Sequence, residues 1–139
     1  MLMITSVLVP VDGSKYSEKA LRYAVGLVKS IGAKELIVLH VIDSSLPYFE
    51  RLKKELEREA EDILNEACNI CRSLGVTCKK ESRIGIPFIE IMKVAKEMGV
   101  DLIVIAQRSR SLKHHPHFIG STAERVAVYS SVNVLLVKT

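Results

Sequence analysis

The sequence predicts an α/β protein built on an open, doubly wound, five-stranded parallel sheet with helices on both faces. Short segments rich in Val, Ile and Leu alternate along the chain with longer segments whose apolar residues recur at helical spacing. Strands separated by helices require crossover connections, and such connections join parallel strands that helices cover on both faces. The length of 139 residues fits one domain, 1–139, and no linker or internal repeat divides it.

The composition is that of an ordinary globular protein. Hydrophobic residues make up 48% of the chain and charged residues 26%, which excludes disorder. No apolar run approaches the ~20 residues that span a bilayer, and Met1 to Val11 lacks a basic leader and a small-residue cleavage site. We therefore expect a soluble, cytoplasmic protein with no membrane partner. The net charge of +4 comes from the C-terminal half without a basic run, so nucleic acid is not an expected partner.

The first strand and helix are predicted on either side of a turn. Residues Ile4–Val11 are largely β-branched and apolar, as in a strand buried on both faces. A turn follows at Asp12 and Gly13, and Ser14 is a suitable N-cap for the next helix. The apolar residues of this helix are Ala20, Leu21, Ala24, Val25, Val28 and Ile31, and Gly32 ends it.

The same pattern repeats twice. Leu36–Ile42 predicts a second buried strand, and Gly75 closes a long amphipathic helix. That helix is marked by Phe49, Leu52, Leu56, Ile63, Leu64, Ala67, Cys71 and Leu74. Val76–Arg83 is polar and alternates weakly, which suits an edge strand. Pro87 opens a third helix, which ends at Gly99.

The last part of the chain predicts two more strands and a short helix. Asp101–Ala106 is strongly apolar, a long connection from Gln107 to Ile119 follows, and Ser121 to about Tyr129 forms the helix. Asn133–Lys138 is the last strand, and it is short and apolar. Pairing with its copy in a homodimer would cover its open edge, whereas Lys138 offers the alternative of an edge protected by charge.

Ligands of open parallel sheets bind beyond the carboxyl ends of the strands, where the strand order reverses. Asp12–Ser14, Val41–Asp43 and Gln107–Ser121 all follow strands at that edge. Asp12 can accept from ribose hydroxyls or a base amino group, while Gly120, Ser121 and Thr122 open a helix whose N–H groups favour an anion. The alternative is that these segments are only turns and helix caps. Neither a P-loop nor a dinucleotide-binding glycine motif is present.

Segments along the whole chain resemble the universal stress protein family. They are Val7–Ser14 with Ser17 and Ala20–Leu21, then Leu39–Val41, Asp101–Val104, Gly120–Val126 and Val134–Val137. The resemblance implies a Rossmann-like, adenine-nucleotide alpha-hydrolase-like fold, a stress-associated regulatory binding module, and a homodimer formed through the last strand. It also implies that Asp12 contacts adenosine, that the Val41 backbone contacts the base, and that Gly120 and Ser121 contact phosphate.

The nucleotide-binding loop of the family departs from its pattern here. The ATP-binding members carry G-x2-G-x9-G-[ST], and that spacing falls on Gln107, Arg110, Gly120 and Ser121, of which only the last two match. A side chain at the first two positions disfavours positive φ and close approach of the backbone to phosphate. Arg108, Arg110 and Lys113 add positive charge that can compensate.

Three functions therefore stay open. The first is a module that binds ATP or another adenine nucleotide through Asp12, Val41, Gln107, Arg110, Gly120, Ser121 and Thr122. The second is a nucleotide-free member of the family that acts through protein contacts. The third is a slow nucleotide hydrolase, which the sequence does not favour because no catalytic base or Mg²⁺ ligand can be named.

The histidines and cysteines favour structural roles. His114, His115 and His117 lie in the long connection without a neighbouring carboxylate, so a surface loop is favoured over a metal site. Cys68 and Cys71 lie near the C-terminal end of a helix, where the dipole does not activate a thiol. We expect these two and Cys78 to be reduced, and the pair to serve as small core residues.

Overall fold

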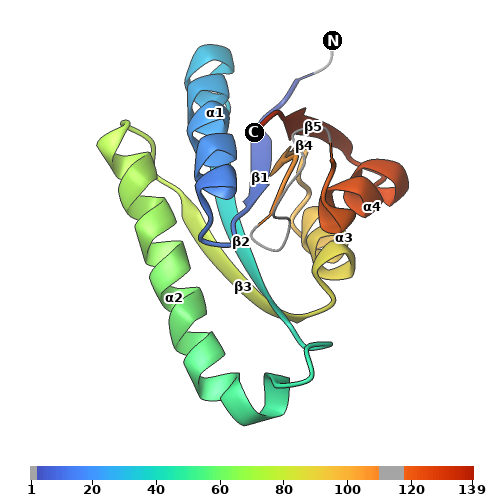
Figure 1. Ribbon diagram of the computed structural model, residues 1–139. Helices are drawn as coiled ribbons and strands as arrows, with labels where there is room; N and C mark the ends of the chain where they lie inside the picture. Colours follow the sequence, from blue (N-terminus) through green and yellow to red (C-terminus); the bar gives the residue numbers. More distant parts are fainter. Residues whose placement is uncertain (1–2, 110–117) are drawn as a thin grey trace.

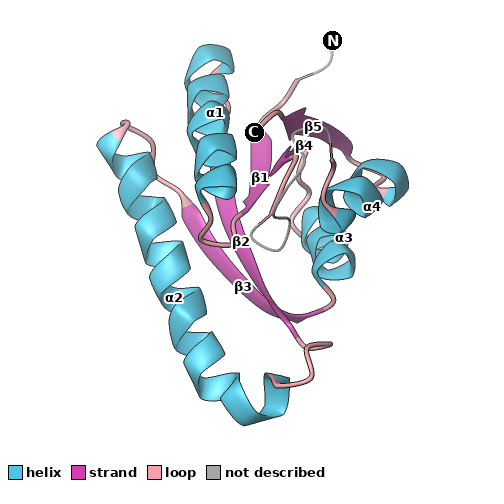
Figure 2. Cartoon of the chain, in the orientation of Figure 1, coloured by secondary structure: helices cyan, strands magenta, loops and turns pink. Residues whose placement is uncertain are grey.

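A computed structural model describes residues 3–109 and 118–139, and in these residues it confirms the predicted sheet. Five parallel strands form one sheet in the order β3-β2-β1-β4-β5 (Figures 1 and 2). The strands are β1 (Ser6–Pro10), β2 (Glu35–Asp43), β3 (Lys79–Gly85), β4 (Leu102–Ala106) and β5 (Asn133–Val137). The helices are α1 (Lys15–Ile31), α2 (Phe49–Ser73), α3 (Pro87–Glu97) and α4 (Ser121–Tyr129).

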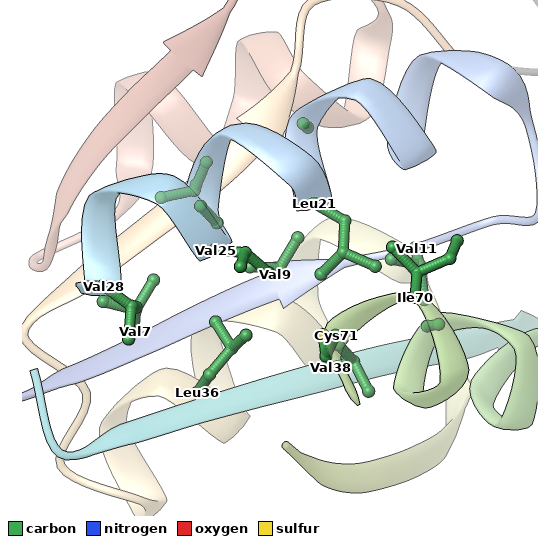
Figure 3. Packing of buried hydrophobic residues seen from close by; sticks show 14 of the residues in the cluster. Val7, Val9, Val11, Leu21, Val25, Val28, Leu36, Val38, Ile70 and Cys71 are labelled. Carbon is green, nitrogen blue, oxygen red and sulfur yellow. The ribbon is translucent and has the colours of Figure 1, made fainter. Parts of the chain in front are cut away.

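The two faces of the sheet are covered by different helices. Helices α1 and α2 lie over one face and α3 and α4 over the other (Figure 1). Alternate residues of β1 supply the two cores, with Val7 and Val9 on the first face and Leu8 on the second, and all three are fully buried. Figure 3 shows the first core, in which Leu21 and Val25 of α1 pack toward β1. Burial on both faces explains why this strand is an unbroken apolar run.

Helix α1 begins and ends where the sequence predicts. The Ser14 hydroxyl accepts the Ser17 N–H at 3.2 Å, and Gly32 ends the helix with a φ of 70°. Helix α2 departs from the prediction at Leu52, where non-helical φ and ψ kink its first turn. No helix in the described residues is long and apolar enough to cross a membrane.

Strand β3 is the edge strand that the sequence predicts, but it begins at Lys79 rather than Val76. The Val76 N–H donates to the Cys71 carbonyl at 2.9 Å, so the start of the predicted segment closes the end of α2 instead. Charged side chains line the strand. Lys79 pairs with Glu35 at 2.7 Å, and Arg83 lies 3.0 Å from both Glu81 and Glu97.

The beginnings of β1 and β4 are joined through one carboxylate. Asp101 Oδ2 accepts the N–H and the hydroxyl of Thr5, both at 2.8 Å, and the Ser6 N–H at 3.0 Å. These hydrogen bonds, first those from Thr5 and then that from Ser6, lower the pKa of the Asp101 carboxyl below its ordinary value. The carboxylate thus links the beginnings of two central strands, at the opposite end of the strands from the predicted site.

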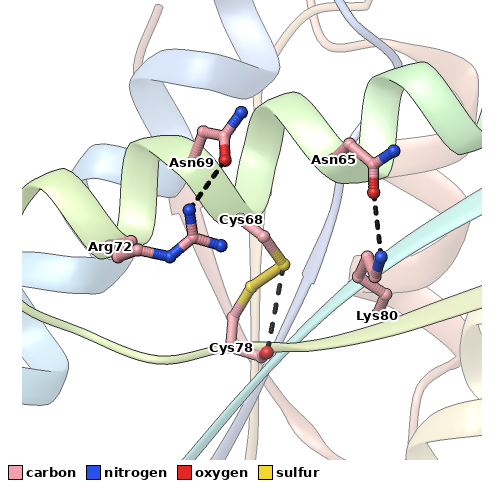
Figure 4. Close-up of a disulfide and its surroundings, with 6 residues drawn as sticks. All are labelled: Asn65, Cys68, Asn69, Arg72, Cys78 and Lys80. Carbon is pink, nitrogen blue, oxygen red and sulfur yellow. Dashed lines mark hydrogen bonds between the residues drawn. A yellow bond between two sulfur atoms is a disulfide. The ribbon is translucent and has the colours of Figure 1, made fainter.

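The expectation of reduced thiols is wrong for two of the three cysteines. Cys68 of α2 and Cys78 before β3 form a disulfide, with Cα atoms 5.9 Å apart (Figure 4). The turn at Leu74 and Gly75 returns the chain and brings Cys78 alongside the helix, a proximity that the spacing of Cys68 and Cys71 does not reveal. Cys71 is a buried core residue, as expected, and burial raises the pKa of its thiol to about 11. It therefore stays protonated and is a poor partner for exchange with the disulfide.

Reduction of the disulfide is expected to lower the free energy of unfolding by about 2–3 kcal/mol, because the bond restricts a short loop in the unfolded chain. Urea denaturation with and without dithiothreitol measures this difference. The double variant Cys68→Ser with Cys78→Ser is the control, and its unfolding midpoint should not respond to dithiothreitol. Equal midpoints for the oxidised and reduced natural chain would contradict the prediction.

Replacement of Asp101 by Ala is expected to destabilise the fold at neutral pH and to have progressively less effect in acid. Because the folded-state pKa is lowered, the carboxylate contributes stability above the unfolded pKa, about 3.9 in peptides, and loses it as pH falls through the folded value. Urea midpoints of both proteins between pH 7 and pH 2.5 test this. A difference between the midpoints that stays constant over that range would show that the carboxylate charge is not the cause.

Candidate functional site

The strand order reverses between β1 and β4, and next to this point β2 runs on past the end of β1. The two strands pair as far as Leu39, whose carbonyl accepts the Val11 N–H at 2.8 Å, while β2 continues to Asp43 beside β3. Backbone groups of alternate residues point to the same side of a strand, so the N–H and C=O of Val41 face the side of β1. Because β1 turns away after Pro10, it does not pair with these two groups.

A cavity of about 560 Å³ lies at this end of the sheet. Its volume is within the range of small-molecule sites, roughly 300–1,000 Å³. Four of the residues predicted for the site line it: Asp12, Val41, Gly120 and Thr122. The other lining residues include His40, Asp43, Leu46, Tyr48, Leu56, Glu59, Ile105, Ala106, Arg108 and Ser109.

Asp12 occupies the turn between β1 and α1. Its Oδ1 accepts the Ser14 N–H at 2.9 Å, and its own N–H donates to the Ser17 hydroxyl at 3.2 Å. Gly13 has a φ of 82°, a conformation that favours glycine. The predicted turn and N-cap are therefore confirmed, and Asp12 of this turn is among the residues that line the cavity.

His40 lines the cavity in a defined tautomer. Its Nδ1 lies 2.7 Å from the Val11 carbonyl oxygen, and a carbonyl only accepts, so Nδ1 carries a proton. In the neutral ring Nε2 is then an acceptor. This contact also ties β2 to the end of β1, just beyond their last paired residues.

The charged and polar residues that line the cavity come from several elements. Carboxylates come from the β1–α1 turn, the end of β2 and helix α2, as Asp12, Asp43 and Glu59. Arg108, the start of α4 at Gly120, and Thr122 come from the segment that follows β4. Such a lining offers acceptors to the hydrogen-bond donors of a ligand, together with a helix N-terminus that favours negative charge.

Arg108 is held in place by two distant parts of the chain. Its guanidinium carbon lies 4.7 Å from the centre of the Tyr16 ring on α1. Its Nε donates to the Thr139 hydroxyl at 3.3 Å, and Nη2 donates to the main-chain oxygen of Thr139. The side chain is half-buried and borders the cavity.

Gln107 forms hydrogen bonds with separate segments of the chain and is not among the residues that line the cavity. Its backbone accepts the Gly120 N–H at 2.7 Å and donates to the Val137 carbonyl at 2.9 Å. Its side-chain amide donates to the Phe118 carbonyl at 2.9 Å and accepts the Thr139 N–H at 3.4 Å. The buried amide therefore joins both ends of the long connection to the residues after β5.

The remaining predicted residues lie at the start of α4 or outside the described residues. Ser121 is the first, exposed residue of α4, after Gly120 in an extended conformation with a φ of −64°. Gly120 thus occupies a conformation open to any residue. Arg110, Lys113 and the three histidines at 114, 115 and 117 lie outside the described residues. Within residues 3–109 and 118–139, no three His, Cys, Asp or Glu side chains gather as a metal-binding group.

Sequence reasoning missed the contribution of α2 to the cavity. Leu56 and Glu59 line it, and Leu56 also packs against the small cluster of Ile42, Phe49 and Ala60 at the end of β2. Leu56, Glu59 and Ile63 have helical spacing and lie close together on one side of α2. A helical projection of α2, together with the length of β2, would therefore have indicated Glu59 as a residue near the end of that strand.

Comparison with known proteins gives relatives over nearly the whole chain. The family model described as Universal stress protein family matches residues 3–138. Universal stress protein MJ0577 of Methanocaldococcus jannaschii is 31% identical over 159 residues, which cover 99% of this chain and 96% of that protein. A solved structure of MJ0577 has a TM-score of 0.84 at 33% identity and covers 99% of this chain and 98% of its own.

Two further solved structures carry adenine nucleotides. One is a universal stress protein in complex with cAMP, with a TM-score of 0.76 at 25% identity, covering 99% of this chain and 100% of its own. The other is the universal stress protein from Archaeoglobus fulgidus in complex with dAMP, with a TM-score of 0.71 at 27% identity and the same two coverages.

Proposed function

Because the chain belongs to the universal stress protein family, we propose that it is a regulatory module that binds an adenine nucleotide in the cavity. The observation that carries the proposal is a cavity of about 560 Å³ at the carboxyl ends of the strands, lined by Asp12, Val41 and the start of α4. Relatives of the same fold are solved with cAMP and dAMP, which share the adenine ring and the phosphate. ATP is included in the proposal, together with other adenine nucleotides.

The proposed pose uses each side of the cavity for one part of the nucleotide. The Val41 backbone presents one donor and one acceptor, as an adenine edge requires, and Asp12 accepts from the ribose hydroxyls. The phosphates lie toward the N–H groups of Ser121 and Thr122, where the α4 dipole favours negative charge. Gln107 supports the loop in this pose, and Arg110 adds positive charge.

The loss of the two leading loop glycines is part of this proposal. Gln107 at the first position is buried and bonded to Phe118 and Thr139, so its side chain does not block the cavity. The backbone N–H of Gln107 is bonded to Val137 and does not reach a phosphate. Binding therefore depends more on charge and on α4 than on a glycine-lined loop. A nucleotide-free member that acts through protein contacts is the alternative.

The proposal places the protein in the cytoplasm, and the Cys68–Cys78 disulfide bears on this point. Disulfides are rare in the cytosol of mesophiles, whereas intracellular proteins of hyperthermophiles contain them. Thiol titration of protein alkylated during rapid lysis distinguishes a bond present in the cell from one formed in air.

Replacement of Asp12 by Ala is expected to weaken adenine nucleotide binding by about 10- to 100-fold, because a hydrogen bond to a charged group contributes about 1.5–3 kcal/mol. Isothermal titration calorimetry with ATP and AMP measures the change, after bound nucleotide has been removed by denaturation and refolding. Asp62→Ala on α2, outside this cavity, is the control and should bind as the natural chain does. Equal affinity for both variants would contradict the proposed pose.

The proposal includes a homodimer formed through β5. The Val137 carbonyl is bonded toward β4, so the N–H groups of Val134 and Leu136 point to the open edge. Val134→Pro removes an outward N–H and should give a monomer in sedimentation velocity at micromolar concentration, whereas Val134→Thr keeps the N–H and should stay dimeric. A monomeric natural chain under the same conditions would contradict the dimer.

A further inference from the structure

We infer that the Cys68–Cys78 disulfide is a site of reversible thiol–disulfide exchange, at which a dithiol reductant opens the bond in the folded protein and loosens the start of edge strand β3. Neither cysteine lines the cavity, so this site is independent of the proposed nucleotide binding. The bond therefore has a role besides its contribution to stability, because its redox state controls the order of one defined segment.

The two bonded cysteines can be reached from solvent. Cys68 and Cys78 are both half-buried, and Thr77 and Lys79, which flank Cys78 in the chain, are exposed. Exchange needs this access because a thiolate must reach one of the two sulfurs. Cys71 differs from this pair, since it is fully buried and burial raises the pKa of its thiol to about 11. It therefore does not react with an external reagent while the fold is closed.

Positive side chains lie near both ends of the bond and favour a thiolate there. Arg72 lies one helical turn beyond Cys68 on α2, and Lys80 lies two residues after Cys78 (Figure 4). Both cations donate to side-chain oxygens of asparagines, at 3.0 and 2.8 Å. An amide oxygen is neutral, so these hydrogen bonds do not offset the positive charges that a thiolate would meet.

The exchange itself moves two electrons from the dithiol to the protein. A thiolate of the reductant attacks one sulfur of the pair, the S–S bond breaks, and the other cysteine leaves as a thiolate that takes up a proton. The second thiol of the reductant then displaces the attacked cysteine from the mixed disulfide. The products are two protein thiols and the disulfide of the reductant, and the reverse exchange with that disulfide restores the bond.

The end of α2 stays in place when the bond opens, because other contacts hold it. Ile70 and Cys71 are buried in the first core. Lys29 Nζ of α1 donates to the Leu74 carbonyl at 3.0 Å, and the Val76 N–H donates to the Cys71 carbonyl at 2.9 Å. None of these contacts involves the disulfide.

The start of β3 has weaker ties to the rest of the fold. None of its residues is fully buried, and Lys79 and Lys80 are exposed. The ion pair of Lys79 with Glu35 lies at the surface, where such pairs contribute little. The end of the strand is held more firmly, because Arg83 pairs with two carboxylates at 3.0 Å. Reduction should therefore loosen the first residues of β3 and leave its end paired with β2.

Loosening of this segment would uncover part of β2. Lys79 pairs with Ile37 and Lys80 with Val38, so the backbone groups of β2 at these positions lose their partners when the start of β3 moves away. An uncovered strand edge can pair with another strand. The redox state of the two cysteines thus controls access to this side of the sheet.

The first experiment tests whether the bond opens in the folded protein. The natural chain is incubated with dithiothreitol without denaturant and then with iodoacetamide, and the alkylated cysteines are identified by mass spectrometry. Cys68 and Cys78 should be alkylated, whereas Cys71 should stay unmodified until urea is added. Alkylation of all three at equal rates would overturn the inference, because the bond would then open only on unfolding. Absence of alkylation without urea would overturn it as well.

The second experiment uses hydrogen–deuterium exchange to locate the segment that the bond controls. After reduction, residues 77–82 should exchange about 10-fold faster, whereas β1 and β4 stay protected over the same first minutes, because local opening is faster than global unfolding. The double variant Cys68→Ser with Cys78→Ser should match the reduced natural chain with or without dithiothreitol. Cys71→Ala is the matched control and should respond to reduction as the natural chain does.

Two results of the exchange experiment would overturn the inference. One is an unchanged rate for residues 77–82 on reduction. The other is an equal loss of protection in β1 and β4, because the bond would then support the whole fold instead of one segment. The comparison of oxidised and reduced natural chain decides between these results even if the double variant does not fold. A failure to bind nucleotides would contradict the proposed function alone.

Discussion

Strand β1 stops while β2 continues, and the cavity depends on this difference in length. The central residues of both strands are buried, and the strands pair as far as Leu39. There Asp12 and Gly13 turn the chain into α1, and β2 is left with backbone groups that no neighbouring strand satisfies on that side. Helix α2 then covers the extension of β2 through Ile42, Phe49 and Ala60. The position of the cavity thus follows from strand length, and residues after β4 complete its lining.

Much of the fold could be predicted because each signal was local. Ser14 and Gly32 bound α1 by hydrogen bonding and by positive φ, both of which depend on residues within one turn. The polar character of Val76–Arg83 predicted an edge strand for the same reason, and the structure has that strand at Lys79–Gly85. The disulfide was missed because it depends on how α2 packs over β3. Nothing local distinguishes Cys78 from Cys71 as the partner of Cys68.

The sequence predicts where the cavity lies, but some residues expected to line it have other contacts in the structure. Asp12 and Val41 lie at the cavity because the carboxyl ends of parallel strands meet there, which topology alone determines. Gln107 follows β4 as expected, yet its amide is used between Phe118 and Thr139, and only the packing of β5 reveals this. The contacts of Arg108 are likewise hidden in the sequence, since Tyr16 and Thr139 are far from it along the chain.

The two edges of the sheet differ in chemistry, and this difference limits how the protein can assemble. Strand β3 carries ion pairs of Lys79 and Arg83, whereas β5 has an apolar and only partly buried stretch from Val134 to Leu136. A sheet with two apolar edges could add copies indefinitely and grow into a filament. When only one edge accepts a partner, association across a two-fold axis leaves a charged strand at each outer end. Growth then terminates after a single step.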